Sequence, residues 1–398
     1  MTSRLFISKK TILVVTLLLS GCVNLPKKNA PILVHSFKNQ YVEYILVPVL
    51  IKGKKYTFML DTGSSSSIID KNLASKLTTN MNELPKLYYK YFNTVNTVSG
   101  QKKLEQINFV HPIPFSIGTK YFDGGEFWVT DDLSLLSQAT GENISGILGV
   151  DIFRQLNWEI DRKNKILTIY DNPPPISEYQ QCSPYDDYTF GSPYFRTYFD
   201  DDIYVSTKLD TGSSSNYISN ELIEYINNNK TNAVLEPVES FNNNISIEFS
   251  GIVKNNNKNY KIKQFQFNNS DFYDKEFHIT NNDSYAIGMS TLESFDKYLL
   301  SPNKMLFCYN MATTQKINLK NNRNINFRSY NNQIEIFYNN EKVTSEFSLK
   351  NGDILISING IKYPANAVTK VKKLIATLPK GQVELVINRQ GKLINIHF

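Results

Sequence analysis

The sequence is poor in the residues that form metal and redox centres. It contains three cysteines and four histidines in 398 residues, and the histidines lie far apart in the chain, without ligand spacing. They are His35, His111, His278 and His397. We therefore expect no metal and no cofactor. Charge of one sign is also scarce: the formal net charge of +6 becomes 6 − 3 = +3 when the three bases of residues 1–21 are left out. This weak bias gives no reason to expect a nucleic-acid partner.

A long hydrophobic run is missing from the N-terminus, where residues 12–19 form an apolar stretch too short to span a membrane as a mature helix. Basic residues precede this stretch, and Leu19-Ser20-Gly21-Cys22 ends it. The ending resembles the lipobox of bacterial lipoproteins. The resemblance implies a signal peptide at 1–21, acyl chains on Cys22 that hold the protein on a membrane, and a tether at 22–34. Val23 at the next position favours the outer membrane of the cell envelope. An uncleaved signal anchor is the alternative.

Aromatic residues, in contrast, are abundant. The chain has 24 Tyr and 24 Phe, which favour strands over helices, and a globular balance of 41% hydrophobic and 20% charged residues. Its length allows two or three domains. We therefore expect a mainly β protein with more than one domain.

One sequence pattern occurs twice. Residues 58–69 run from an apolar strand through Asp61 into a polar turn and out into a second apolar strand, and residues 207–218 repeat this around Asp210, 210 − 61 = 149 residues later. Further matches follow in the same order: 97–100 with 248–251, 127–130 with 277–280, 147–149 with 286–288, and 164–170 with 303–309. Five ordered matches indicate two copies of one β-rich unit.

The spacing also predicts the boundaries of these units. We place the first lobe at 35–172, a proline-rich linker at 173–184 and the second lobe at 185–311. Hairpins are predicted for 44–51 with 56–60, and for 157–161 with 166–170. Cys182 and Cys308 are either bridged or free, since nothing in the sequence shows that they are close.

A third unit is predicted at 312–398. It contains an amphipathic helix near 364–378, with Val368, Val371, Leu374 and Ile375 on one face, and a final hairpin at 383–388 and 392–398. The segments 351–355 and 358–360 resemble bacterial PDZ domains. A glycine-rich loop that would bind a carboxylate is not recognisable at 339–345, so capture of a peptide C-terminus is not implied.

Two carboxylates held close together share a proton, because both cannot be charged without a large repulsion. The charged member can take a proton from water that attacks an amide, while the protonated member gives one to the carbonyl oxygen. Glycine beside each carboxylate allows a tight turn, and the hydroxyls of Ser64 and Ser213 are placed to donate to the outer oxygens.

The two Asp-Thr-Gly-Ser segments, with 147–149 and 286–288, resemble the active-site loops of pepsin-like and retropepsin-like aspartic peptidases. The resemblance implies two tandem retropepsin-like β-barrel lobes in a bilobal acid-protease fold, followed by a small PDZ-like α+β domain. It implies a monomeric enzyme that hydrolyses protein or peptide substrates. By the resemblance the catalytic residues are Asp61 and Asp210, the loop residues are Thr62, Gly63, Ser64, Thr211, Gly212 and Ser213, and the flap residues are Ser99, Gly100, Ser250 and Gly251.

The second lobe departs from that pattern in two places. Lys208 occupies a position that is normally apolar, where a solvated strand edge is the simplest interpretation, and residues 288–291 lack a counterpart of Asp151. Three alternatives stay open. One is a homodimer built from first lobes, the second is a non-catalytic peptide-binding lipoprotein that uses the same cleft, and the third makes the PDZ-like unit the functional end.

Overall fold

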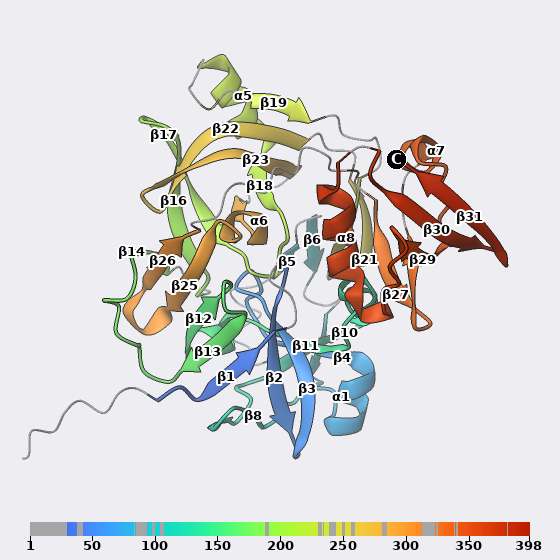
Figure 1. The fold of residues 1–398 in the computed structure, drawn as a ribbon. Helices are drawn as coiled ribbons and strands as arrows, with labels where there is room; N and C mark the ends of the chain where they lie inside the picture. Colours follow the sequence, from blue (N-terminus) through green and yellow to red (C-terminus); the bar gives the residue numbers. More distant parts are fainter. Residues whose placement is uncertain are drawn as a thin grey trace, which may run out of the picture.

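The computed structural model shows a mainly β protein (Figure 1), which confirms the predicted fold class at this level. The structure describes residues 30–37, 43–82, 84, 94–97, 100–103, 107–187, 191–229, 233, 235–238, 244–248, 251–255, 259–280, 285–312, 323, 325–337, 339, 341–379 and 381–398. Both predicted hairpins are present. The first turns at Lys52 and Gly53, both of which have the positive φ that a tight hairpin turn requires.

The first lobe is an eight-stranded sheet that places the loop of Asp61. Its order is β7 (Asn108–Val110), β10 (Trp128–Asp131), β4 (Ile68–Asp70), β11 (Ile144–Leu148), β3 (Lys54–Leu60), β2 (Ile45–Ile51), β8 (Phe115–Ile117) and β9 (Lys120–Phe122). Strand β11 lies between β3, to which it is parallel, and β4, to which it is antiparallel. The loop from β3 to β4 must therefore pass over the end of β11.

The second lobe repeats this arrangement. Its order is β15 (Asp186–Asp187), β16 (Pro193–Asp200), β17 (Ile203–Leu209), β24 (Ala286–Ile287), β18 (Asn216–Ser219), β23 (Ser270–Thr280), β22 (Asn259–Phe267) and β19 (Leu235–Val238). Strand β24 lies between a parallel β17 and an antiparallel β18, as β11 does in the first lobe. An added pairing of β16 with β22 closes the curled sheet on itself.

A six-stranded sheet joins the lobes, in the order β1 (Leu33–Ser36), β13 (Ile166–Tyr170), β12 (Asn157–Asp161), β25 (Phe295–Ser301), β26 (Leu306–Met311) and β14 (Gln181–Pro184). Its central pair, β12 and β25, brings one strand from each lobe into register, with Trp158 opposite Leu300. At the edge, Cys182 of β14 is bonded to Cys308 of β26, which decides the question that the sequence left open.

Apolar side chains fill the space between these sheets. One buried cluster includes residues of both lobes, and its largest fully buried members include Trp158, Phe295 and Phe307. Because Trp158 comes from the first lobe and Phe295 and Phe307 from the second, the two lobes share one apolar core. The lobes therefore hold a fixed relation to each other, which a site made from both requires.

Short helices cover the sheets. They are α1 (Lys71–Leu77), α3 (Ser134–Thr140), α4 (Val150–Phe153), α5 (Asn220–Asn228), α6 (Met289–Leu292) and the 3-10 turn η2 (Pro302–Lys304). Helices α1 and α5 begin directly after β4 and β18, and each is capped by a side chain that accepts from backbone N–H groups, Asp70 and Ser219. The repeat thus extends to helices that the sequence analysis did not predict.

Two separate hairpins carry the predicted flap segments. They are β5 (Thr94–Thr97) with β6 (Gly100–Lys103), and β20 (Asn244–Glu248) with β21 (Gly251–Asn255). Thr97 pairs with Gly100 and Glu248 with Gly251, so both tips fall at equivalent places. Gly100 and Gly251 begin the returning strands, whereas Ser99 and Ser250 lie outside the described residues.

The C-terminal unit is a five-stranded antiparallel sheet, β27 (Phe327–Tyr330), β28 (Gln333–Ile336), β29 (Ile354–Ile358), β30 (Glu384–Arg389) and β31 (Lys392–His397). It also has α7 (Glu341–Glu346), the turn η3 (Ala365–Ala367) and α8 (Val368–Thr377). The predicted helix and final hairpin are confirmed, and Val368, Val371 and Ile375 are buried in the unit's own core.

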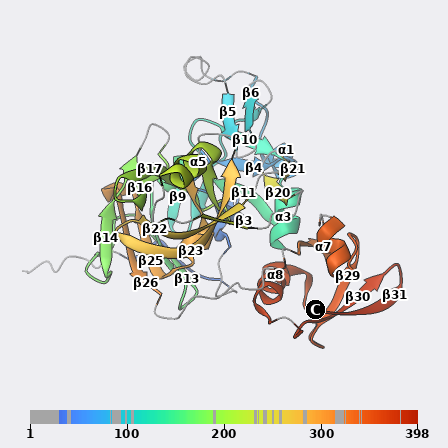
Figure 2. The same cartoon turned by 90° about the horizontal axis from the view of Figure 1, so that it is seen from above.

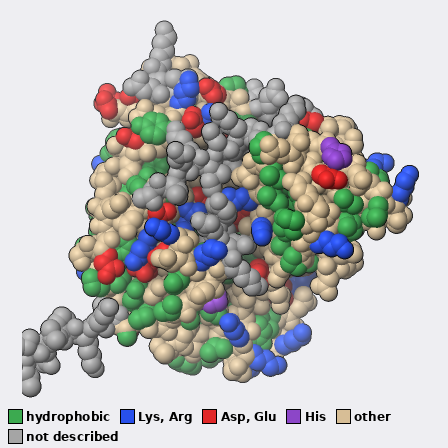
Figure 3. Space-filling view, in the orientation of Figure 1, with side chains coloured by type: hydrophobic (Ala, Val, Ile, Leu, Met, Phe, Trp, Pro, Cys, Tyr) green, Lys and Arg blue, Asp and Glu red, His purple; other side chains and the backbone are tan. Residues whose placement is uncertain are grey.

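The C-terminal unit lies at one side of the two lobes (Figures 1 and 2), and Figure 2 shows α3 on the side of the lobes that faces it. On the face shown in Figure 3, basic and acidic side chains are interspersed, so that face is of mixed charge. In the part of the chain that the structure describes, no helix is both long and apolar enough to cross a membrane. Cys22 and the predicted signal peptide lie outside the described residues.

Candidate active site

The two predicted carboxylates lie at equivalent strand ends. Asp61 directly follows β3 and its N–H donates to Leu148 O at 2.9 Å, while Asp210 directly follows β17 and donates to Ile287 O at the same distance. Each strand therefore stays paired with its parallel neighbour up to the carboxylate. The repeated sequence produces the repeated geometry because the same apolar strands surround each loop.

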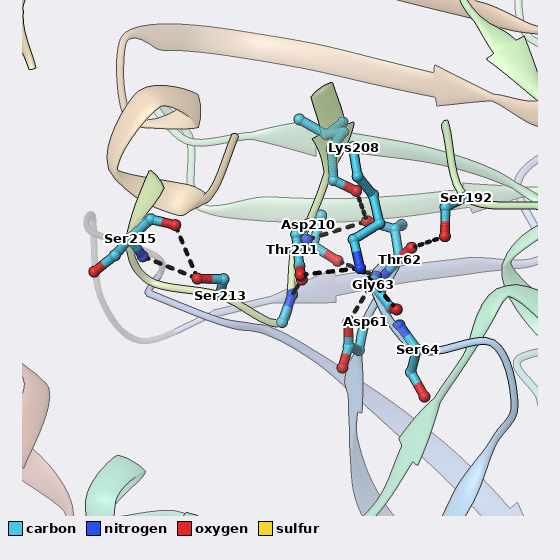
Figure 4. A network of polar contacts seen from close by, with 12 residues as sticks. Asp61, Thr62, Gly63, Ser64, Ser192, Lys208, Asp210, Thr211, Ser213 and Ser215 are labelled. Atoms are coloured by element: carbon cyan, nitrogen blue, oxygen red, sulfur yellow. Dashed lines mark hydrogen bonds and ion pairs between the residues drawn. The ribbon is translucent and has the colours of Figure 1, made fainter. Parts of the chain in front are cut away.

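Two threonines lock the loops together across the lobe interface (Figure 4). The N–H of Thr62 donates to Thr211 Oγ1 at 3.1 Å, and the N–H of Thr211 donates to Thr62 Oγ1 at 3.1 Å. Each hydroxyl then donates to the strand of the other lobe, Thr62 to Leu209 O at 2.6 Å and Thr211 to Leu60 O at 2.9 Å. Both threonines are fully buried, so water cannot replace these bonds.

The glycines of the loops bring each carboxylate against the opposite lobe. A Cβ atom on Gly63 would lie 2.5 Å from Asp210 Cγ, and one on Gly212 would lie 2.5 Å from Asp61 Oδ2. Such distances are far inside van der Waals contact, so glycine is required at both positions. The same glycines also donate to their own loop's carboxylate, Gly63 N–H to Asp61 Oδ1 at 2.8 Å and Gly212 N–H to Asp210 Oδ1 at 3.0 Å.

The protonation of the pair follows from this closeness. Burial and the neighbouring Asp210 raise the pKa of Asp61 to about 7, and the ammonium group of Lys208 and the N–H of Gly63 oppose that rise. A side-chain hydrogen bond with Asp210 also favours the protonated form of Asp61. The site can thus present one protonated and one charged carboxyl group together near neutral pH, which is what combined acid and base chemistry needs.

Serine hydroxyls support the loops and do not donate to the carboxylates, contrary to what the sequence analysis expected. Ser64 Oγ donates to Ser66 O, and Ser213 Oγ donates to Ser215 O, both at 2.8 Å. It is the backbone N–H of Ser64 that reaches Asp61 Oδ1, at 3.1 Å. The hydroxyls therefore shape the turns, and backbone N–H groups solvate the carboxylates.

The second lobe has other hydrogen bonds in place of those that Asp151 makes in the first lobe. In the first lobe Ser67 Oγ accepts from Gly149 N–H at 3.1 Å and donates to Asp151 Oδ1 at 2.8 Å. In the second, Asn216 Oδ1 accepts from Gly288 N–H at 3.0 Å and from Thr291 Oγ1 at 2.9 Å.

A different pair of residues thus holds the second loop, so the lack of an Asp151 counterpart is no defect. The signal was in the sequence, because Asn216 stands six residues after Asp210, as Ser67 stands six after Asp61. Ser192, also unpredicted, supports the first loop from the second lobe by donating to Thr62 O at 2.7 Å.

Among the described residues, no group of three or more His, Cys, Asp or Glu side chains could hold a metal ion. Two carboxyl groups on facing loops, one of them protonated near neutral pH, suit the activation of water against a carbonyl carbon.

Comparison with known proteins supports this interpretation. Residues 47–152 match the model of a family described as aspartyl protease, a stretch that contains Asp61 and ends just beyond Asp151. The match supports an aspartyl protease family and, with it, peptide hydrolysis of protein or peptide substrates. No curated protein matches the chain.

Proposed function

We propose that the protein is an aspartic endopeptidase in which Asp61 and Asp210 together activate water. The observation that carries the proposal is the reciprocal bonding of Thr62 and Thr211, which joins two equivalent loops and sets one carboxylate from each lobe face to face. The family match covers the first of these loops. The second loop has the same geometry, which supports extending the assignment to Asp210.

In the proposed reaction the water oxygen bonds to the amide carbon while a water proton passes to the charged carboxylate, Asp210. Asp61 gives its proton to the carbonyl oxygen, so the tetrahedral intermediate forms without a net change of charge on the pair. As the C–N bond breaks, Asp210 gives the proton it took from water to the leaving nitrogen, and one hydroxyl of the intermediate returns a proton to Asp61, so the pair regains its starting charge. The raised pKa of Asp61 supports its role as the initial acid.

The proposal extends to the location, the oligomeric state and the domains of the protein. Cys22 anchors the chain in the bacterial cell envelope, at the outer membrane, and the chain acts as a monomer of two retropepsin-like lobes with a PDZ-like unit at 312–398. The hairpins that contain Gly100 and Gly251 act as flaps over an extended substrate. Their equivalent positions in the two lobes support a shared role.

The C-terminal unit restrains the lobes in this proposal and does not capture substrate. Helix α3 of the first lobe contacts both β27, the edge strand of the unit, and α8, so the surface between them is already covered. Arg328 of β27 donates to Gln138 Oε1 at 2.9 Å. On the other side, Lys373 of α8 is paired with Glu293 of the second lobe at 3.3 Å. The unit therefore contacts both lobes.

A charge reversal tests this restraint. Lys373→Glu would face Glu293, and we expect faster hydrogen exchange in α3 and α8 and a severalfold change in peptide turnover. Lys370→Glu, an exposed position on the same helix, is the matched control. Equal exchange in both variants would show that the contact does not hold the unit in place.

The catalytic proposal is tested by Asp61→Asn and Asp210→Asn, assayed by digestion of a peptide library across pH. Either change should abolish cleavage while the thermal unfolding midpoint shows that the protein remains folded. Activity that survives Asp210→Asn would reject the two-lobe dyad and favour a homodimer of first lobes. Binding of peptides without turnover by the unaltered protein would favour the non-catalytic lipoprotein.

A further inference from the structure

Lys208 lies within the candidate site and not on a solvated strand edge, which corrects the expectation from the sequence (Figure 4). Strand β17 is an inner strand, between β16 and β24. The Lys208 ammonium group donates to Gly63 O of the opposite loop at 3.1 Å and lies 3.7 Å from Asp210 Oδ2. Its side chain is 25% exposed. One cation thus contacts both active-site loops.

The equivalent position of the first lobe is apolar. Met59 stands two residues before Asp61, as Lys208 does before Asp210, and it is buried in a cluster that includes Leu133 and is covered by Leu136 of α3. Twelve residues, 132–143, separate β10 from β11, whereas five, 281–285, separate β23 from β24. Five are fewer than the seven residues of α3. The second lobe thus has a shorter segment at the place where the first lobe packs α3 against the cluster of Met59.

The described groups around Lys208 come from both active-site loops and from the two strands beside β17. Asp61 and Asp210 are the carboxylates, and Lys208 is the cation that acts on Asp61. On β16, Tyr194 lies opposite Lys208 in the strand register, and on β24 its neighbour is Ala286. The Lys208 N–H donates to the backbone oxygen of Tyr285 at 2.9 Å. Among the described residues, Lys208 forms an ion pair with Asp210 and acts on the charge of Asp61.

We propose that Lys208 is a positioning residue of the dyad: its ammonium group ties the second loop to the first and offsets part of the negative charge that the pair carries. The inference rests on the proposed peptidase function. The threonine and glycine contacts are nearly symmetric between the lobes, whereas Lys208 stands where the first lobe has the apolar Met59, and the Ser64 N–H donates to Asp61 Oδ1 at 3.1 Å.

The consequence for pH dependence has a definite sign. Lys208 lowers the pKa of Asp61 against the larger effects of burial and Asp210. Removing the ammonium charge therefore raises the pKa of Asp61, and the pair keeps its shared proton to higher pH. The alkaline limb of the activity profile then moves upward, by about one pH unit for a cation at this range.

The test compares Lys208→Gln, which keeps a donor for Gly63 O but has no charge, with Lys208→Arg, which keeps both. Peptide cleavage is measured from pH 3 to pH 9 on the full chain. We expect the alkaline limb to rise by about one unit in Lys208→Gln and to stay in place in Lys208→Arg. Lys263→Gln, which removes a half-exposed lysine of β22 from the same lobe, controls for net charge and should leave the profile unchanged. If Lys208→Gln does not fold, Lys208→Met copies Met59 and carries the same expectation.

A second measurement does not need activity. The free energy of unfolding in urea is followed from pH 4 to pH 9 in Lys208→Gln and in the unaltered protein. Lys275, whose pKa burial lowers to about 8, titrates in this range in both proteins, so the difference between the two curves is compared. The fall in stability that Asp61 contributes should extend about one pH unit higher in Lys208→Gln. Profiles and stability curves that match the control variant overturn the inference about Lys208. Absence of cleavage by the unaltered protein, with the expected shift in the stability curve, overturns the peptidase function and leaves the inference about the charge of the pair in place.

Discussion

The threonine network makes a quantitative prediction that does not depend on activity. Thr62→Val keeps the shape of the side chain but removes Oγ1, so Thr211 N–H loses its acceptor and Leu209 C=O loses its donor. Both bonds are buried and join different lobes. Each buried group left without its partner costs about 1–3 kcal/mol, so the free energy of unfolding should fall by about 2–6 kcal/mol.

Thr62→Ser is the matched control, since it keeps the hydroxyl and loses one methyl group, for about 1 kcal/mol. Thr211→Val removes the equivalent pair of bonds and should cost the same as Thr62→Val. The double variant should cost less than the sum, because the first substitution already loosens the interface that the second weakens.

Urea unfolding measures these differences, followed by the fluorescence of Trp128 and Trp158, both buried in the first lobe. A Thr62→Val variant within about 0.5 kcal/mol of Thr62→Ser would refute the reasoning, because it would mean that these bonds do not hold the loops together.

Three further predictions follow from the site and the sheet. The pKa of Asp61 is about 7 in the folded protein and near 4 in the unfolded chain, so the free energy of unfolding should fall as the pH rises between these values. In Asp61→Asn, the free energy of unfolding measured in urea should vary less with pH over this range. Gly63→Ala forces a carboxylate aside and should lower peptide turnover about a hundredfold, while Ser65→Ala on the exposed part of the same loop should not. Cys308→Ser, which breaks the bond to Cys182, should lower the free energy of unfolding by about 2–5 kcal/mol under oxidising conditions, and a reductant should remove the difference.

The predictable part of the fold followed from local signals. The hairpin at Lys52 and Gly53 was predicted because a short basic turn separates two apolar runs, and the helix α8 because its buried residues recur at helical spacing. Short helices such as α4 and α6 have only four residues each, too few for a periodic pattern to show. Their presence depends on the loops that precede them.

The candidate site was predictable only in part. Asp61 and Asp210 stood out because a repeated motif places one carboxylate in each copy. Lys208 was misjudged because its neighbour across the lobe interface, Gly63, cannot be inferred from its own strand. Asn216 was missed because it is a different residue type from Ser67, although it accepts from the equivalent glycine N–H of its own lobe.

The sequence by itself determined a mainly β protein with a duplicated unit, one carboxylate in each copy and a different C-terminal unit, because strand patterns and repeats are properties of neighbouring residues. Tertiary structure decided which residues of the two copies contact each other across the lobe interface. Thr62 bonds across the interface to Thr211, and Lys208 reaches the opposite loop, through contacts that span about 150 residues of chain. The raised pKa of Asp61 exists only where burial and a second carboxylate act on it together, and only the folded pair of lobes supplies both.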